Sequence, residues 1–315
     1  MFDPTSAINL IVGRSTLPVV TGMALLSLAC TDTTGPLLSP TESCVDQQAA
    51  ALVSFLDSNL DAAVKNALGL GANGRATCGM VGNLEFVDAN FSGITDLTGI
   101  QNLTGVTELY FAGNFIVDTS PLTALTGLRI LDLGENEITD ISPLSLLTEL
   151  VALGVNENSI SDISPVAGLT DLEVLALDGN AITDIGALTG LGFLQRLTLH
   201  DNQISDVSVL GDFASLEILD LGENPVSDVS TLSGHLNLAE LGLDLTLVTD
   251  ISALEALEAI IILKLTGNSL FSNVQPLLDN SNLGPGVTVF LEGTDVSCID
   301  VSALIAKKLT VISNC

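Results

Sequence analysis

Short blocks in which leucine alternates with variable residues recur along most of this chain. Two of them read LRILDLGENEITDIS at 128–142 and LEILDLGENPVSDVS at 216–230. Alternation with a period of two predicts a short strand that buries one of its faces. In the first block we expect Leu131 and Leu133 to point inward and Asp132 to point outward.

Each block ends in an asparagine, and these asparagines lie 22 residues apart except across Thr246. They are Asn114, Asn136, Asn158, Asn180, Asn202, Asn224 and Asn268. A side-chain amide both donates and accepts, so stacked copies can satisfy the backbone groups of a buried turn. A unit of this length cannot bury a core alone. The period therefore predicts repeats that stack into a solenoid.

A second fixed polar position follows each turn. It is occupied by Asp96, Asp118, Asp140, Asp162, Asp184, Asp206, Asp228 and Asp250. One interpretation is a ladder of calcium sites, but calcium takes about six to eight oxygens and one carboxylate per turn supplies too few. We favour the other interpretation, in which each aspartate accepts backbone N–H bonds from the turn that follows. The pairs Ser142-Pro143 and Ser164-Pro165 support it, because serine and proline suit a helix cap and the first helical residue.

This pattern, LxxLxLxxN followed by I-[TS]-D-[IV] in 22-residue register, resembles the bacterial leucine-rich repeats of the internalin type. The resemblance runs from about Ser54 to Ser272. It implies an α/β repeat fold: a leucine-rich repeat solenoid with a concave parallel β-sheet and short 3₁₀ or irregular segments on the convex side. It also implies a helical N-terminal cap and no enzymatic activity. Neither a sorting motif nor a second domain follows the repeats, so wall attachment and a host receptor are not carried over.

The N-terminal cap helix is also predicted by its own residues. Leu60, Val64 and Leu68 recur at every fourth position and form one apolar face. Asp57 or Ser58 can cap the start of this helix. The glycine that follows Leu68 ends it.

The five cysteines all lie outside the regular repeats. Cys44 and Cys78 flank the N-terminal cap, and Cys298 and Cys315 flank the last segment. The end turns of a solenoid have one stacking neighbour and fray most easily, so cross-links there have a physical use. We predict that both pairs are disulfides, which indicates an oxidising compartment. A zinc site is the alternative, but no C-x-x-C or Cys/His spacing supports it.

The remaining cysteine, Cys30, follows a short apolar run, LPVVTGMALLSLA at 17–29. The run is too short to span a bilayer, and Arg14 precedes it. It resembles a bacterial lipoprotein signal peptide with Cys30 as the lipidated first residue of the mature chain. The alternatives are an ordinary secretory signal cleaved nearby or a misassigned start. The resemblance implies an exported protein, held at the cell envelope or outer surface by a lipid anchor, or secreted.

These features divide the chain into five segments. They are a signal peptide (1–29), a lipidated tether (30–43), an N-terminal helical cap (44–91), leucine-rich repeats (92–272), and an irregular last repeat with a disulfide-closed C-terminal cap (273–315).

The chain is strongly acidic, with 38 Asp and Glu against 8 Lys and Arg and a formal net charge of −30. It would repel phosphates and has no basic patch, so nucleic acid is excluded as a partner. An acidic surface favours solubility in salt or attraction to cationic partners. We expect a monomer whose only membrane contact is the lipid anchor.

The sequence predicts no catalytic site, metal or cofactor. GLGANG at 69–74 matches the dinucleotide fingerprint, but it follows a predicted helix instead of a strand, so we interpret it as a loop. His200 and His235 are the only histidines, and neither offers a convincing base for a triad.

The outward positions of the strands predict a binding surface of mixed apolar and acidic character. The candidate ligand-binding residues are Tyr110, Ile130, Asp132, Val174, Asp178, Arg196, His200, Ile218, Asp220 and Lys264. A parallel sheet left open on one face is unusual, and it is common in repeat proteins that bind along it. The alternative is that these positions only suit β-branched residues in a parallel sheet.

Two functional hypotheses follow from these features. In the first, the protein is an anchored interaction module that binds a protein or glycan on its concave face. In the second, it is a structural or adhesive surface or matrix protein without one specific ligand.

Overall fold

The structure is a computed structural model that describes residues 35–45 and 47–315. The predicted signal peptide and the lipidation site at Cys30 lie outside the described residues. The chain forms two compact units. The first holds the described residues up to Ile138 together with Ala152–Gly154, and the second holds Thr139–Val151 and Val155–Cys315.

The first unit stacks parallel strands of three residues each. The strands are β1 (Phe86–Asp88), β2 (Glu108–Tyr110), β3 (Ile130–Asp132) and β4 (Ala152–Gly154). The helical segments are α2 (Ser58–Ala67), α3 (Cys78–Val81), and the 3₁₀ turns η1 (Ile100–Asn102) and η2 (Ser120–Ala124). Each strand pairs with the next in a register of 22 residues, as Leu109 does with Leu131.

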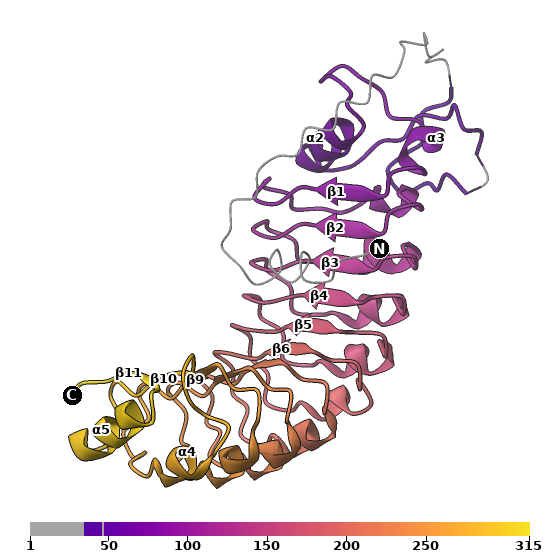
Figure 1. Cartoon of the computed structure of the whole chain (residues 1–315). Coiled ribbons are helices and arrows are strands. Elements are labelled where there is room, and N and C mark those ends of the chain that lie inside the picture. The colour runs from indigo at the N-terminus through magenta and orange to yellow at the C-terminus, as the bar shows by residue number, and fades with distance from the viewer. Residues whose placement is uncertain (1–34, 46) are drawn as a thin grey trace. The chain divides into compact units, whose positions relative to one another are not determined.

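The second unit repeats this architecture. Its strands are β5 (Val174–Ala176), β6 (Arg196–Thr198), β7 (Ile218–Asp220), β8 (Glu240–Gly242), β9 (Ile262–Lys264), β10 (Thr288–Phe290) and β11 (Thr310–Ile312). Its 3₁₀ turns are η3 (Ser142–Leu146), η4 (Ser164–Gly168), η5 (Gly186–Leu188), η6 (Ser208–Asp212), η7 (Ser230–Gly234) and η8 (Ser252–Ala256). Two helices, α4 (Gln275–Asp279) and α5 (Cys298–Ala306), lie near its end. Within each unit the strands lie side by side and the 3₁₀ turns line the opposite side (Figure 1).

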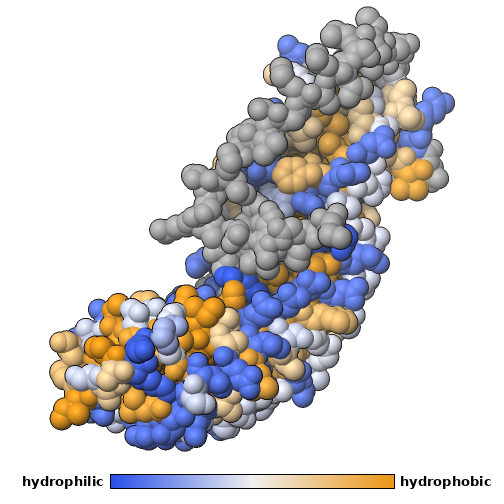
Figure 2. Space-filling view, viewed as in Figure 1, coloured by the Kyte–Doolittle hydropathy of each residue, from blue (hydrophilic) through white to orange (hydrophobic). Residues whose placement is uncertain are grey.

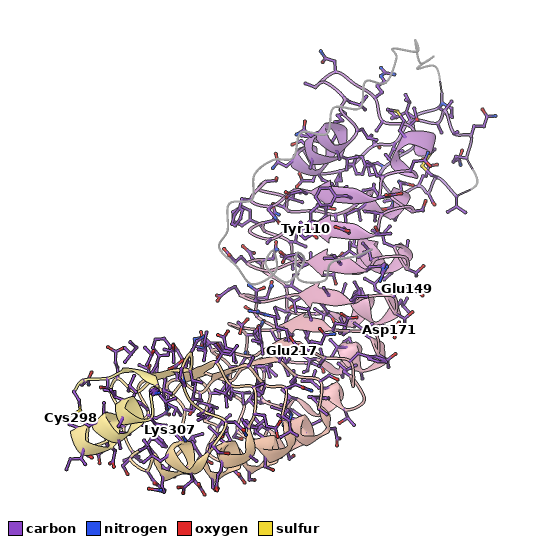
Figure 3. All side chains as sticks on the ribbon, viewed as in Figure 1. Tyr110, Glu149, Asp171, Glu217, Cys298 and Lys307 are labelled. Atoms are coloured by element: carbon purple, nitrogen blue, oxygen red, sulfur yellow. A yellow bond between two sulfur atoms is a disulfide. The ribbon has the colours of Figure 1, made fainter. Side chains whose placement is uncertain are left out.

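An aliphatic core lies between the strands and the helical turns. Side chains fill this space in both units (Figure 3). In one repeat Leu197, Leu199 and Ile204 are fully buried. Burial of each such side chain contributes roughly 1.5–3 kcal/mol relative to exposure. The alternation of leucine with variable residues therefore buries one face of each strand, as the sequence predicts.

The asparagine at the end of each strand closes the turn with hydrogen bonds. Asn202 Nδ2 donates to the carbonyl oxygens of Leu177 and Leu199, both at 3.0 Å. Its Oδ1 accepts the N–H of Ile182 at 3.0 Å. One amide thus satisfies backbone groups in its own repeat and in the preceding one.

Thr246 replaces this amide in one repeat. Its hydroxyl lies 2.9 Å from Leu243 O and 2.9 Å from Asn268 Oδ1. A hydroxyl carries one proton and therefore donates to one of these acceptors at a time. Thr246 thus performs part of the asparagine's role, and its side chain remains buried.

The aspartate after each turn accepts a backbone N–H two residues later. The acceptor is Oδ1 of Asp96, Asp118, Asp140, Asp162, Asp184, Asp206, Asp228 and Asp250, at 2.7–2.9 Å. These bonds support the turn-capping interpretation. Among residues 35–45 and 47–315, no cluster of three His, Cys, Asp or Glu could hold a metal ion. The predicted cap position is off by one residue, because Ser142 is the first residue of η3 and Ile141 precedes it.

The N-terminal cap helix is present as predicted. Asp57 is its N-cap, because Oδ1 accepts the N–H groups of Asn59 (2.7 Å) and Leu60 (3.2 Å). Oδ2 of the same carboxylate accepts the N–H of Thr95 at 2.8 Å. Asp57 therefore joins α2 to the first repeat, and α2 packs against β1.

Both ends of the described chain carry a disulfide. Cys44 is joined to Cys78, with Cα atoms 5.5 Å apart. Cys298 at the start of α5 is joined to Cys315, with Cα atoms 5.4 Å apart. The disulfide-closed C-terminal cap is confirmed.

A lysine completes the C-terminal cap. Lys307 follows α5, and its Nζ donates to the carbonyl oxygens of Leu277 (2.8 Å) and Leu278 (2.7 Å) in α4 (Figure 3). An ammonium that binds the free carbonyls at a helix end satisfies acceptors that the helix leaves open. The two helices are thereby held together.

Apolar surface is concentrated near this end in Figure 2, around α5 and β11. Ile299 and Ile305 of α5 are among the exposed residues. Within the part of the chain that the structure describes, no helix combines the length and hydrophobicity needed to cross a bilayer.

Candidate functional site

The strand register builds the candidate surface from two rows of side chains. In β2 to β9 the central leucine points into the core, so the residues on either side of it point to the opposite face, which we call the open sheet face. In the second unit the first row runs Arg196, Ile218, Glu240, Ile262 and the second runs Thr198, Asp220, Gly242, Lys264.

The predicted ligand-binding residues fall into two groups. Those almost fully buried are Tyr110, Ile130, Asp132 and Val174. Those that remain partly exposed are Asp178, Arg196, His200, Ile218, Asp220 and Lys264. The second group lies entirely in the second unit.

The buried group in the first unit is centred on Tyr110. Its hydroxyl donates to Glu108 Oε2 at 3.2 Å, and its ring centroid lies 5.4 Å from that of Phe86. Burial, together with the nearby carboxylate of Glu108, raises the pKa of the phenol. Contacts with Glu108 and Phe86 therefore fix the position of Tyr110.

The exposed group forms a network of charges. His200 Nδ1 lies 3.6 Å from Asp220 Oδ1, and His200 Nε2 lies 3.4 Å from Glu223 Oε1. Lys264 Nζ lies 2.7 Å from Glu240 Oε1 and 3.9 Å from Asp220 Oδ2. These side chains are 23–45% exposed, so each pair contributes only roughly 0–1 kcal/mol to stability. The network accordingly has little value as a structural support.

The charges on this surface influence one another. Burial works against the charge of Lys264, but Glu240 and Asp220 outweigh it and raise the pKa of the ammonium. Burial lowers the pKa of the Arg196 guanidinium, and among the carboxylates Glu240 opposes this shift most strongly. Both groups remain cationic at neutral pH.

Two further carboxylates fix the backbone at the strand ends. Asp178 accepts hydrogen bonds from the Thr198 hydroxyl and from His200 N, the latter at 2.8 Å. Asp244 accepts the N–H of Thr266 at 2.7 Å. Burial raises the pKa of both carboxyls. These bonds hold the strand ends in place and so preorganise the surface.

Glu223, Glu240 and Asp244 belong to this surface although the sequence did not single them out as ligand-binding. Glu240 shares a row with Arg196, and it lies one strand from Lys264. That register could have indicated the pairing. Glu223 lies in the turn after β7, and the strand pattern carries no information about where a turn side chain points.

The second histidine has a structural role. His235 is buried, with Nε2 2.8 Å from Leu210 O and Nδ1 3.3 Å from Leu232 O. Both ring nitrogens face carbonyl oxygens, so His235 is not placed to activate a nucleophile.

The 22-residue period, the parallel strands and the asparagine turns define a leucine-rich repeat protein. Models of leucine-rich repeats match residues 104–146 and 193–234, and a further single-repeat model matches residues 168–189. No curated protein sequence matches the chain.

Comparison with solved structures shows which family of leucine-rich repeat proteins the chain belongs to. The chain is 31% identical to internalin C2 of Listeria monocytogenes, with 74% of this chain and 93% of that chain covered and a TM-score of 0.61. It is 26% identical to internalin F of the same organism, with 82% and 89% covered and a TM-score of 0.56. The chain belongs to the internalin family of leucine-rich repeat proteins, as its sequence predicts.

The same fold occurs in a plant receptor. The chain is similar to the leucine-rich repeat ectodomain of the membrane receptor kinase GASSHO1/SCHENGEN3 of Arabidopsis thaliana, at 19% identity. The match covers 70% of this chain and 31% of that chain, with a TM-score of 0.55. Leucine-rich repeat proteins generally serve as binding scaffolds and lack catalytic activity.

Proposed function

We propose that this chain is a non-enzymatic, exported interaction protein that binds a protein or glycan partner through the open sheet face of its second unit. The observation that carries the proposal is the partly exposed charge network of Arg196, His200, Asp220, Glu240 and Lys264. Its ion pairs add little stability, and the strand ends beside it are fixed by hydrogen bonds. A rigid polar surface without a structural purpose is typical of a binding site.

The scarcity of positive charge supports the same surface. The sequence contains only 8 Lys and Arg, and two of them, Arg196 and Lys264, lie on β6 and β9 of the second unit. Arginine is enriched at binding hot spots, and Ile218 adds a partly exposed apolar side chain next to Arg196. The plant ectodomain was solved in complex with CASPARIAN STRIP INTEGRITY FACTOR 2, so the fold can carry a bound partner.

We also propose export and a lipid anchor on Cys30, with the chain acting as a monomer. The disulfides at Cys44–Cys78 and Cys298–Cys315 support export, because such bonds persist in oxidising compartments. Mass spectrometry of the mature N-terminus tests the anchor. We expect a diacylglyceryl group on Cys30, and an unmodified Cys30 would contradict the anchor but leave the binding proposal intact.

The binding proposal is tested by the double variant R196E/I218D. Immobilised wild-type chain is used to capture partners from the native secretome and membrane fraction, and the affinity of each purified partner is then measured by surface plasmon resonance. The double variant reverses a charge and places a carboxylate at the apolar contact. We expect it to weaken binding at least about tenfold, the effect of losing about 1.4 kcal/mol.

A matched control is the double variant S233D/E255K. It also combines one charge reversal with one new carboxylate, although the reversal is from acid to base, and it places them on η7 and η8, where both residues are exposed. We expect this control to bind like the wild type. Equal binding by R196E/I218D and the wild type would instead favour a structural or adhesive surface protein without one specific ligand.

A further inference from the structure

Two exposed leucines stand at a turn where most other repeats carry glycine or a polar residue. Leu245 is 55% exposed and Leu247 is 59% exposed. Leu245 directly precedes Thr246, the position that asparagine holds in most repeats. The equivalent residues of the other repeats are Phe91, Gly113, Glu135, Glu157, Gly179, Asp201, Glu223 and Gly267. Apolar side chains at the surface of this turn therefore need an explanation other than the repeat pattern.

The backbone at Leu245 is unfavourable for leucine. Its φ is 53°, in the left-handed region, which favours glycine. The equivalent residue is left-handed in every repeat from Phe91 to Gly267. Glycine would fit this conformation without strain. A residue with a strained backbone persists only where the surrounding structure holds it, and such residues cluster at functional sites.

The side chain of Leu245 is supported by the next repeat. A Cβ on Gly267 would come within 2.3 Å of Leu245 Cδ2, so the leucine lies directly against that glycine. This contact holds the leucine in a defined position while more than half of it remains exposed. The strained residue is consequently a fixed surface feature.

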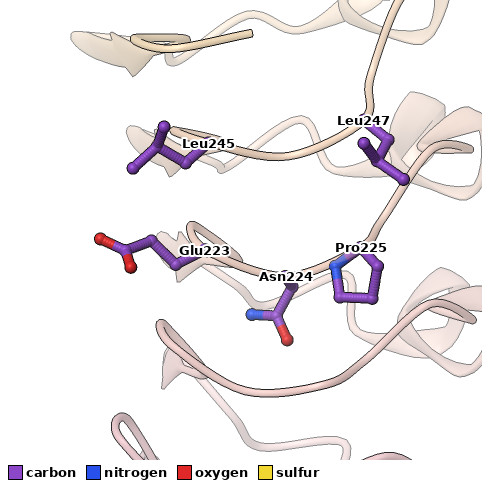
Figure 4. Close-up of a pocket in the computed structure, with 5 residues that line it drawn as sticks. All are labelled: Glu223, Asn224, Pro225, Leu245 and Leu247. Carbon is purple, nitrogen blue, oxygen red and sulfur yellow. The ribbon is translucent and has the colours of Figure 1, made fainter.

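Leu245 and Leu247 line a pocket with the turn of the preceding repeat. Its other lining residues are Glu223, Asn224 and Pro225, and its volume is about 380 Å³ (Figure 4). In Figure 4, Glu223 and Leu245 point to the same side of their turns, and Leu247 lies beside Pro225. The pocket therefore presents an apolar wall with a carboxylate at one end.

Glu223 connects this pocket to the open sheet face. Its Oε1 lies 3.4 Å from His200 Nε2, and the other nitrogen of that ring lies 3.6 Å from Asp220. Lys264 lies 3.9 Å from Asp220 and offsets part of its charge, and the carboxylate of Glu223 adds a negative charge beside the pocket. A partner segment that lies across the ends of these strands contacts the carboxylates of Asp220 and Glu223 next to Leu245 and Leu247.

We propose that this pocket is a subsite for an extended partner segment in which an aliphatic side chain stands next to a lysine or arginine. The aliphatic side chain packs against Leu245, Leu247 and Pro225, and the cationic group pairs with Glu223. This subsite rests on the proposed function, because it extends the binding surface from the open sheet face over the strand ends. Charge complementarity identifies the occupant: an acidic chain with a carboxylate beside exposed leucines fits a basic, amphipathic segment.

The test uses a labelled octapeptide in which leucine alternates with lysine, and fluorescence anisotropy on the full chain. Peptides of alternating serine and lysine, and of leucine and glutamate, are matched for length. We expect the leucine–lysine peptide to bind at least tenfold more tightly than either. Equal affinity of the leucine–lysine and serine–lysine peptides would overturn the proposal, because the attraction would then be purely electrostatic.

The variant L245G/L247S removes the apolar wall and relieves the strained backbone. We expect it to fold with a thermal midpoint at or above the wild type and to bind the leucine–lysine peptide at least tenfold more weakly. E223Q should also weaken binding and reduce its dependence on salt. The control F193S removes an exposed apolar residue that precedes β6, on the side where strands begin, and should bind like the wild type.

The variants separate this subsite from the proposed function. Retention of the leucine–lysine peptide by L245G/L247S rejects the pocket and leaves the proposed function intact. R196E/I218D adds negative charge near the pocket, so it should not weaken binding of the cationic peptide. Equal binding of the captured partner by R196E/I218D and the wild type rejects the sheet face and leaves the pocket to be judged by the peptide.

Discussion

At the scale of single residues, the asparagine turns carry the most specific structural role. Each amide makes bonds in two repeats at once, as Asn202 does with Leu177, Leu199 and Ile182. A residue with one hydroxyl makes fewer, as Thr246 shows. The recurrence of asparagine is thus explained by the number of backbone groups that one side chain must satisfy.

Replacing Asn202 with alanine should destabilise the second unit by about 1–3 kcal/mol, because buried backbone groups lose their partners. N202T should cost less, since a hydroxyl restores one bond. Urea unfolding followed by circular dichroism measures both free energies. A loss for N202T as large as that for N202A would contradict the role assigned to the hydrogen bonds.

The sequence predicted the roles of single residues correctly where a side chain packs in the core or bonds backbone groups of the turn or helix end to which it belongs. The N-cap at Asp57, the asparagine turns and the inward leucines all follow from local rules. The network around His200 did not, because Glu223 reaches it from a turn whose left-handed backbone is not encoded by leucine periodicity. The burial of Ile130 and Asp132 was also not predicted, since alternation gives the face of a side chain but not its exposure.

At the scale of elements, the aspartates before the 3₁₀ turns η3, η4, η6 and η7 link folding to pH. The N–H and hydroxyl of Ser230 hold the pKa of Asp228 below its usual value, and Ser142, Ser164 and Ser208 do the same for their aspartates. A carboxyl with a lowered pKa in the folded state stabilises the fold above its ordinary pKa of about 3.9. That stabilisation is lost as pH falls through the folded-state pKa.

The variant D228A should therefore be less stable than the wild type at pH 7 and should approach it in acid, where Asp228 is protonated. Thermal midpoints of both proteins between neutral and strongly acidic pH measure this difference. D228N retains an acceptor oxygen, so it should lie closer to the wild type at pH 7. A difference between D228A and the wild type that does not change with pH would show that the charge on Asp228 is irrelevant.

The C-terminal disulfide makes a separate prediction for α5 and β11. Cys298 and Cys315 are 17 residues apart, and closing a loop of that size contributes about 3 kcal/mol in the chain-entropy model. C298S/C315S should speed amide exchange in α5 and β11 and leave β5 to β8 unchanged. Hydrogen exchange with mass spectrometry measures this, and equal acceleration in every strand would contradict a local role for the disulfide.

At the scale of the whole molecule, the dominant property is a net charge of −30. Repulsion among carboxylates opposes the folded state and is screened by salt, with a Debye length of about 10 Å at 0.1 M. The thermal midpoint should therefore rise when sodium chloride is increased from about 0.01 M to about 0.5 M. Differential scanning calorimetry checks this, and a falling midpoint would mean that the ion pairs outweigh the repulsion.

The period of 22 residues predicts the fold of the repeats, because stacking is the only way such a unit can bury its leucines. It does not predict the division of the chain into two compact units, whose segments alternate between Ile138 and Val155. Both units share the same repeat, so the period also does not predict that the accessible charges lie in the second unit. The position of the candidate surface depends on the variable residues, which the repeat leaves free.

The most direct test of the proposed binding surface is hydroxyl-radical footprinting of the full chain with and without a captured partner. We predict that the partner reduces modification of His200 and Leu245 and leaves that of Phe193 and Leu146 unchanged. Phe193 precedes β6, and Leu146 lies on η3, away from the strand ends. Protection of Phe193 and Leu146 with no change at His200 would place the partner elsewhere and contradict the account.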